Sequence, residues 1–219
     1  MERIICIIIG YVFGLFSTGT IVGKLNGVNL RKEGSKNVGA TNALRTLGAK
    51  MGALVLLGDA FKCIFAIVLC RFLFRDSYSG NLMLVSLYAA IGAILGHNFP
   101  ITNKFKGGKG IACTAGCILS FGPVITVICL FVFFGLFFVT HYVSVCSIVL
   151  YVTCFIAIVL AGQSGALEGQ IFQANLYEAY IIVFVMMCLA IFMHRENIKR
   201  LINHCENKTY LSKKNKKNN

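Results

Sequence analysis

A polar segment at residues 33–45 has the composition of an anion-binding loop. Its glycines let backbone N–H groups approach an anion closely, and its Ser, Thr and Asn side chains add neutral hydrogen-bond donors. Arg45 offers a guanidinium fork that fits a phosphate, and a helix that begins near Thr41 would add the partial positive charge of its N-terminus. The alternative is a flexible polar loop between two spans. We expect a phosphate site formed by Ser35, Asn37, Gly39, Thr41, Asn42 and Arg45.

A second segment, residues 96–110, is cationic and rich in glycine. Three of its lysines lie within six residues, and an apolar helix is predicted to begin directly after them, so that its N-terminus faces the loop. It is not a Walker A loop, because no Gly stands five residues before Gly108 and no Ser or Thr follows Lys109. An anion-binding loop and an ordinary basic loop beside a membrane explain this composition equally well. The candidate residues are His97, Lys104, Lys106, Gly107, Gly108 and Lys109.

Two shorter motifs near the C-terminal half carry polar residues at helical spacing. Ser144 and Ser147 are three apart and share one helix face, where they could also cap the start of the helix. His194 and Asn197 share a face in the same way, within a basic segment that is also typical of a helix end beside a membrane. Both motifs are therefore candidates for a binding site, each with a simpler alternative.

One pair of charges interrupts an apolar run. Asp59 and Lys62 are three residues apart in the middle of the second run, where an unpaired charge is costly. A mutual ion pair is the economical interpretation. The pair either stabilises the structure or takes part in handling a proton or substrate.

The composition indicates an integral membrane protein. The 219 residues are 57% hydrophobic and only 13% charged, which is about half of the charged fraction of a soluble domain. This composition argues against an ordinary soluble fold and against intrinsic disorder. The net charge of +13 could indicate nucleic-acid binding, but the basic residues lie between long apolar runs. That pattern is typical of membrane topology, so no nucleic-acid partner is expected.

Neither a metal nor a cofactor is expected. Most of the ten cysteines lie in apolar runs and none forms a C-x-x-C motif, so they are interpreted as packing residues. The eight acidic residues are spread thinly along the chain, and no His or carboxylate accompanies Cys113 and Cys117. No histidine has a carboxylate at the spacing of the H-x-x-x-x-D acyltransferases, which excludes that His–carboxylate base.

The apolar runs predict an all-α, polytopic fold with about seven transmembrane helices. The run 111–140 exceeds one crossing and contains Gly122-Pro123, so we divide it there into a short helix and a full one. The three basic segments then share one side, which the positive-inside bias identifies as the cytoplasm. These segments are residues 24–50, 97–110 and the chain after 194.

This topology places the N-terminus outside and the C-terminus in the cytoplasm. Residues 1–206 are expected to form one transmembrane domain. Residues 207–219 are rich in Lys and Asn and are predicted to form a basic, disordered tail that touches anionic membrane lipid.

Five motifs together resemble one family, the bacterial acyl-phosphate:glycerol-3-phosphate acyltransferases (PlsY). The resemblance runs in order from the first span to about Glu206. It departs from the family at Lys36, where Gly is expected, and at His141, Cys146 and His204-Cys205. The motifs are Ser35-Lys36-Asn37-Val38-Gly39-Ala40-Thr41-Asn42, Gly96-His97-Asn98-Phe99-Pro100, Lys104-Phe105-Lys106-Gly107-Gly108-Lys109-Gly110, Tyr142-Val143-Ser144 and His194-Arg195-Glu196-Asn197-Ile198-Lys199-Arg200.

The resemblance implies a seven-helix enzyme of the bacterial inner membrane with its active site at the cytoplasmic face. It would transfer a fatty acyl group from acyl phosphate to the sn-1 hydroxyl of glycerol 3-phosphate, giving lysophosphatidic acid and phosphate. Neither acyl-CoA nor a metal would be used, and a peripheral enzyme that produces acyl phosphate is a possible partner. The expected catalytic residues are Ser35, Arg45, Lys106, Ser144 and His194. The expected substrate-binding residues are Asn37, Gly39, Thr41, Asn42, His97, Lys104, Gly107, Gly108, Lys109 and Asn197.

The chemistry suits these residue types, because an acyl phosphate is already activated and two phosphates must be neutralised side by side. No protein nucleophile is required, so direct attack by the substrate hydroxyl is expected. The proton would pass to the departing phosphate or to His194. The leading alternative is a transporter of organophosphate anions, and a second is a membrane anchor that recruits a partner through its basic tail.

Overall fold

Every regular element in residues 1–210, the part of the chain that the computed structural model describes, is helical. Six segments are long and apolar enough to cross a membrane, which confirms the predicted all-α membrane fold. The elements are α1 (Glu2–Gly14), α2 (Thr18–Leu25), α3 (Ala40–Leu47), α4 (Ala49–Leu73), α5 (Leu82–Asn98), η1 (Ile101–Asn103), α6 (Ile111–Leu119), α7 (Pro123–Thr140), α8 (Val143–Gln163), η2 (Gln173–Asn175), α9 (Leu176–Met193) and α10 (Arg195–Ile202).

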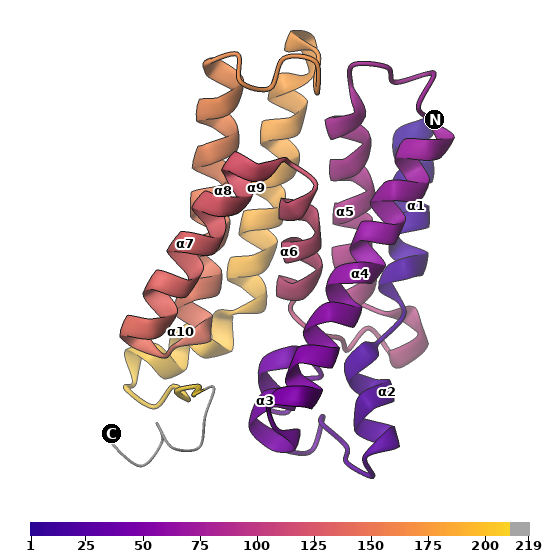
Figure 1. The fold of residues 1–219 in the computed structure, drawn as a ribbon. Helices are drawn as coiled ribbons and strands as arrows, with labels where there is room; N and C mark the ends of the chain where they lie inside the picture. The colour runs from indigo at the N-terminus through magenta and orange to yellow at the C-terminus, as the bar shows by residue number, and fades with distance from the viewer. Residues whose placement is uncertain (211–219) are drawn as a thin grey trace.

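The long helices run up and down in one bundle, and the N-terminus lies at its upper end (Figure 1). The short helices α2, α3 and α10 and the loop between α5 and α6 all lie at the lower end (Figure 1). The three basic segments of the sequence therefore meet at one end of the bundle. At the other end, the connection between α4 and α5, residues 74–81, contains one basic residue, Arg75, and residues 163–175 contain none.

The apolar run 111–140 is divided at Gly122-Pro123, as its length predicts. α6 ends at Leu119 and α7 begins with Pro123 at its first position, where a missing N–H costs nothing. α6 has nine residues, so at 1.5 Å each it is only about half as long as a bilayer core is thick. It is therefore not among the six segments long enough to cross, and the bundle combines six full spans with one short helix.

The turn between α6 and α7 would expose backbone carbonyls inside the membrane, where no water is present to bond them. Polar side chains satisfy these groups instead. The Arg71 guanidinium donates to Ser120 O at 3.0 Å, and the Thr126 hydroxyl lies 3.0 Å from Ile118 O and 2.8 Å from Gly122 O. These bonds allow a half-length helix to end inside the bundle.

Small residues let α1 and α5 approach each other closely. A Cβ atom on Gly10 would lie 2.1 Å from Ala89 O, and one on Gly96 would lie 2.2 Å from Tyr11 O. α5 is the most buried of the spans, whereas α7 turns most of its surface outward. This contact between small residues is the usual way in which helices pack tightly in lipid. It fixes α5, whose last turn carries His97, at the centre of the bundle.

Candidate active site

The polar loop before α3 is organised around one buried side chain, Asn42. Its Oδ1 accepts the Ser35 N–H at 2.8 Å, and its Nδ2 lies within 3.0 Å of three backbone carbonyls, those of Leu30, Glu33 and Asn37. Asn42 is 1% exposed. The loop is thus folded back onto the first turn of the helix that follows it. Asn42 uses its polar atoms to shape the loop, although the sequence predicts it as a residue that binds substrate.

Lys36 occupies the position where the family pattern has Gly, and its backbone is left-handed, with φ of +57°. Its N–H donates to Glu33 O at 2.9 Å, which closes a tight turn. A residue with a Cβ atom is strained in this conformation, whereas Gly is not. The turn that Gly would favour is therefore retained in this chain at an energetic cost.

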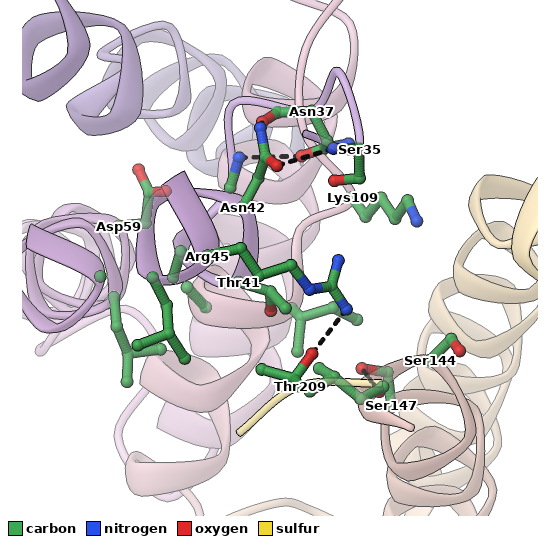
Figure 2. Close-up of a pocket in the computed structure, with 18 of the residues that line it drawn as sticks. Ser35, Asn37, Thr41, Asn42, Arg45, Asp59, Lys109, Ser144, Ser147 and Thr209 are labelled. Carbon is green, nitrogen blue, oxygen red and sulfur yellow. Dashed lines mark hydrogen bonds between the residues drawn. The ribbon is translucent and has the colours of Figure 1, made fainter. Parts of the chain in front are cut away.

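One cavity of about 420 Å³ lies between the loop before α3, α4, the start of α6, α7, the start of α8 and the C-terminal segment. Figure 2 shows its polar side chains, which come from segments far apart in the sequence. The predicted residues that line it are Ser35, Asn37, Gly39, Thr41, Asn42, Arg45, His97, Lys109, Ser144, His194 and Asn197. The fold therefore brings the polar loop, the glycine-rich loop and both C-terminal motifs together.

Four predicted residues do not line this cavity. Lys104 and Lys106 are exposed on the loop between α5 and α6, and the Lys106 carbonyl accepts a hydrogen bond from Arg31. Gly107 and Gly108 lie directly behind the cavity wall, where their N–H groups donate to the backbone of α5 at 3.0 Å. The glycines thus attach the loop to α5, and the next residue, Lys109, is the lysine that reaches the cavity.

Arg45 points across the cavity toward the C-terminal segment (Figure 2). Its Nη2 donates to Asn207 O at 2.9 Å and to the Thr209 hydroxyl at 2.5 Å, while its buried Nε has no partner in residues 1–210. Burial lowers the pKa of Arg45, and the nearby Glu206 opposes that shift. The guanidinium keeps a free donor beside the cavity for an anion.

Lys109 is the second cation of the cavity. Its ammonium group donates to the side-chain oxygen of Asn197. Burial, together with the positive charges of Arg200 and Arg45, lowers the pKa of Lys109 to about 8, while Glu206 opposes the shift. A lysine with this pKa is still mostly charged at neutral pH, and an arriving phosphate would stabilise its charge further.

Glu206 joins the two C-terminal motifs, and the sequence does not indicate this role. Its carboxylate accepts hydrogen bonds from Ser144 Oγ at 3.2 Å, Asn197 Nδ2 at 2.7 Å and Arg200 Nε at 2.7 Å. Its side chain is 3% exposed. The only signal in the sequence is that Glu206 is one of two acidic residues within the basic segment after residue 194.

The C-terminal segment continues across the site after Glu206. Thr209 is buried, and its N–H donates to His141 O at 2.9 Å, while the rings of His141 and Tyr210 lie 4.8 Å apart. The sequence places a disordered tail at 207–219. Residues 207–210 of that tail pack against the site, and residues 211–219 lie outside the described part of the chain.

His194 lines the cavity in its neutral form. Its Nδ1 lies 2.8 Å from Ala190 O, and because a carbonyl can only accept, the ring proton belongs on Nδ1 and Nε2 remains an acceptor. Burial and the positive charge of Lys109 lower the pKa of His194 to about 4. His194 is therefore suited to accept a hydrogen bond from a substrate hydroxyl.

One side of the cavity wall is apolar. Phe133, Phe134 and Phe137 of α7 and Leu56 of α4 line it, and both Leu56 and Phe134 are close to half exposed on the outer surface of the bundle. The same cavity thus offers cationic and polar groups on one side and a hydrocarbon wall on the other. No group of three His, Cys, Asp or Glu side chains that could share a metal ion occurs in residues 1–210.

Fold and site together define a polytopic membrane protein with an amphiphilic cavity that presents two cationic side chains, Arg45 and Lys109. The sequence model of glycerol-3-phosphate acyltransferases matches residues 4–204. The chain is 36% identical to the glycerol-3-phosphate acyltransferase of Bacillus subtilis (strain 168), over 92% of this chain and 95% of that protein. It is also 36% identical to the enzyme of that name from Clostridioides difficile (strain 630), over 94% of each chain.

Solved structures agree with the sequence comparison. The crystal structure of PlsY (YgiH), an integral membrane glycerol 3-phosphate acyltransferase, in its glycerol 3-phosphate form is similar with a TM-score of 0.80, 31% identity and 96% of each chain covered. Its lysophosphatidic acid form is similar with a TM-score of 0.77, 30% identity and coverage of 96% of this chain and 97% of that one. The chain belongs to the glycerol-3-phosphate acyltransferase family, and it is an acyltransferase, not a transporter or an anchor.

Proposed function

We propose that this enzyme transfers a fatty acyl group from acyl phosphate to the sn-1 hydroxyl of glycerol 3-phosphate at the cytoplasmic face of a bacterial plasma membrane. The observation that carries the proposal is the amphiphilic cavity, in which Arg45 and Lys109 lie in the same pocket as the apolar wall of α7. Two phosphates need the cations, and a fatty acyl chain needs the apolar wall. The basic end of the bundle supports the cytoplasmic orientation, with the N-terminus outside.

Direct attack by the substrate hydroxyl fits the serines of the site. The Ser144 hydroxyl donates to Glu206, and the Ser147 hydroxyl donates to Val143 O at 2.7 Å. No histidine in residues 1–210 accepts a hydrogen bond from either of them or from Ser35. The base beside Ser144, the Glu206 carboxylate, already accepts hydrogen bonds from Asn197 and Arg200. A serine without an available base is a weak nucleophile, so an acyl-enzyme is not favoured.

The proton has two candidate acceptors, and the departing phosphate is the better one. In the reaction the hydroxyl oxygen bonds to the acyl carbon, the bond from that carbon to the phosphate oxygen breaks, and the hydroxyl proton is released. A histidine with a pKa of about 4 is a weak base at neutral pH, whereas a phosphate has its second pKa near about 6. His194 therefore orients the hydroxyl, and the phosphate leaves with the proton.

The donor is tested with purified protein, a fatty acyl phosphate and labelled glycerol 3-phosphate. We expect lysophosphatidic acid and free phosphate without added metal, and no product when acyl-CoA replaces acyl phosphate. Equal turnover with acyl-CoA would refute the proposed donor. Incubation with acyl phosphate alone, followed by mass spectrometry, should leave the protein unmodified, and a stable acyl group on a serine would contradict direct attack.

The site assignment is tested by two substitutions of basic residues at the same end of the bundle. Arg45→Ala should reduce kcat/KM for glycerol 3-phosphate by about 100-fold, since it removes a charge-assisted donor from the cavity. Lys106→Ala tests the residue predicted from the sequence, and its exposed position outside the cavity leads us to expect a smaller loss. Equal losses would show that Lys106, as well as Lys109, reaches the substrate.

A further inference from the structure

A buried cluster of ionisable side chains lies in the cavity wall and has no part in the reaction described above. Asp59 and Lys62 come from α4 and His97 from the last turn of α5. Their side chains are 2%, 4% and 5% exposed, respectively. Asp59 and His97 both line the cavity. The ion pair predicted from the spacing of Asp59 and Lys62 is formed, with 2.9 Å between Nζ and Oδ1.

The surroundings of Lys62 fix the proton on the ring of His97. The Lys62 ammonium can only donate hydrogen bonds, and its oxygen neighbours can only accept them. His97 Nδ1 lies 2.8 Å from the ammonium but 3.7 Å from the Asp59 carboxylate, which is too far for a hydrogen bond. Nδ1 therefore accepts from Lys62. The other neighbours of the ammonium are Phe16 O at 2.7 Å and Gly14 O at 3.3 Å.

The neutral ring must then carry its proton on Nε2, on the side of the glycine-rich loop. Gly108 N donates to the His97 carbonyl at 3.0 Å, and a Cβ atom on Gly108 would lie only 2.0 Å from Nε2. Nε2 has no hydrogen-bond partner in residues 1–210. The Nε2–H group of His97 is thus a free donor beside Gly108, which has no side chain to cover it and directly precedes Lys109.

We propose that Lys62 and Asp59 are positioning residues that hold His97 as its Nε2–H tautomer, and that His97 donates this hydrogen to a phosphoryl oxygen of bound substrate. The proposal rests on the function proposed above and adds one donor to its site. Lys62 sets the tautomer, and Asp59 balances the charge of Lys62 while accepting a hydrogen bond from Thr18 at 3.1 Å. The phosphate belongs either to glycerol 3-phosphate or to the acyl donor.

The tautomer is measured by NMR on full-length protein labelled with ¹⁵N-histidine, and His97→Gln assigns the signal among the four histidines. We expect an unprotonated Nδ1 and a protonated Nε2, and a shift of the Nε2 signal when one of the two substrates is added. A ring protonated on Nδ1 would overturn the proposal. The NMR measurement needs no turnover, so it gives the tautomer of His97 even if the enzyme uses a different acyl donor. A failure of this proposal can therefore be distinguished from a failure of the proposed function.

The positioning role is tested with the double variant Asp59→Asn/Lys62→Met, which removes both charges and leaves neither unpaired. We expect a loss of about 10-fold in kcat/KM, because Nδ1 loses its donor and the two tautomers mix. His97→Phe, which removes the donor itself, should cost about 100-fold. A rise in KM for only one substrate identifies the phosphate that is bound.

The matched control removes the ion pair at the other end of the bundle, where Arg3 Nε lies 2.6 Å from Glu178. Arg3→Met/Glu178→Gln should retain wild-type activity. If Asp59→Asn/Lys62→Met folds and keeps its wild-type kcat and KM, the cluster does not position His97 and the proposal is wrong, and a lowered unfolding temperature alone would then mark the cluster as structural. If that double variant does not fold, a wild-type kcat/KM in His97→Phe would overturn the proposal equally.

Discussion

The side-chain oxygen of Asn42 accepts a 2.8 Å hydrogen bond from the backbone N–H of Ser35 and so joins the polar loop to the start of α3. Asn42→Ala would remove this bond and leave buried carbonyls without a donor. We expect a loss of about 2–3 kcal/mol in the free energy of unfolding and a raised KM for glycerol 3-phosphate. Thermal unfolding in detergent and steady-state kinetics measure the two effects.

The control for this prediction lies in the same loop. Asn29 Oδ1 accepts a 3.1 Å hydrogen bond from Arg31 N at an exposed position. Asn29→Ala should change stability by less than about 1 kcal/mol, since water can replace the lost bond. Equal effects of the two substitutions would show that Asn42 does not organise the loop.

The pKa of Lys109 predicts how the enzyme responds to alkaline pH. The ordinary pKa of 10.5 is lowered to about 8, so Lys109 loses its charge as pH rises through about 8. Affinity for glycerol 3-phosphate should fall over this range. The free energy of unfolding should instead rise as the pH increases from about 8 to 10.5. In that range the unfolded chain binds a proton that the folded chain lacks, so removing protons favours the folded state.

Lys109→Arg is the matched variant for this test, since arginine stays charged throughout the range. KM for glycerol 3-phosphate, measured from about pH 7 to about pH 10, should rise in the wild type and stay flatter in the variant. An alkaline rise that is identical in both proteins would assign the titration to another group, for example the substrate.

Glycine at position 108 is required by the close approach of His97. A Cβ atom there would lie 2.0 Å from the ring nitrogen Nε2, so Gly108→Ala must displace either the ring or the loop. We expect at least about a 100-fold loss of kcat/KM, because Lys109 moves with the loop. Gly135 on α7 has nothing within 4 Å of its Cβ position, and Gly135→Ala should keep full activity.

The left-handed conformation of Lys36 predicts a stabilising substitution. A residue with a Cβ atom destabilises the folded state by about 1–2 kcal/mol in this conformation, and glycine avoids that cost. Glycine also lowers stability by about 0.5–1 kcal/mol, because it increases the conformational entropy of the unfolded chain. Lys36→Gly should therefore stabilise the protein by roughly 0.5–1 kcal/mol. Lys32→Gly, in the same loop without a positive φ, should destabilise it. If a denaturant titration finds Lys32→Gly more stable than Lys36→Gly, the backbone of Lys36 is not strained.

The amino-acid sequence by itself determined the membrane class, the division of the run 111–140 and most of the polar side chains that line the cavity. Apolar runs and glycine-proline breaks are local signals, and each is readable without knowing the neighbours of the segment. The motif at 33–45 is also a local signal, because its glycines and short polar side chains indicate an anion-binding loop without reference to neighbouring segments.

The tertiary structure decided which basic residues reach the site and which residues only shape it. Lys104, Lys106 and Lys109 lie in one glycine-rich segment, and the sequence alone does not distinguish them. The hydrogen bonds from Gly107 and Gly108 to α5 direct only Lys109 toward the cavity. Glu206 bonds to residues on α8 and α10, and no spacing along the chain records that contact. Such roles depend on which helices pack together, and this is fixed by burial across the whole bundle, not by any local pattern.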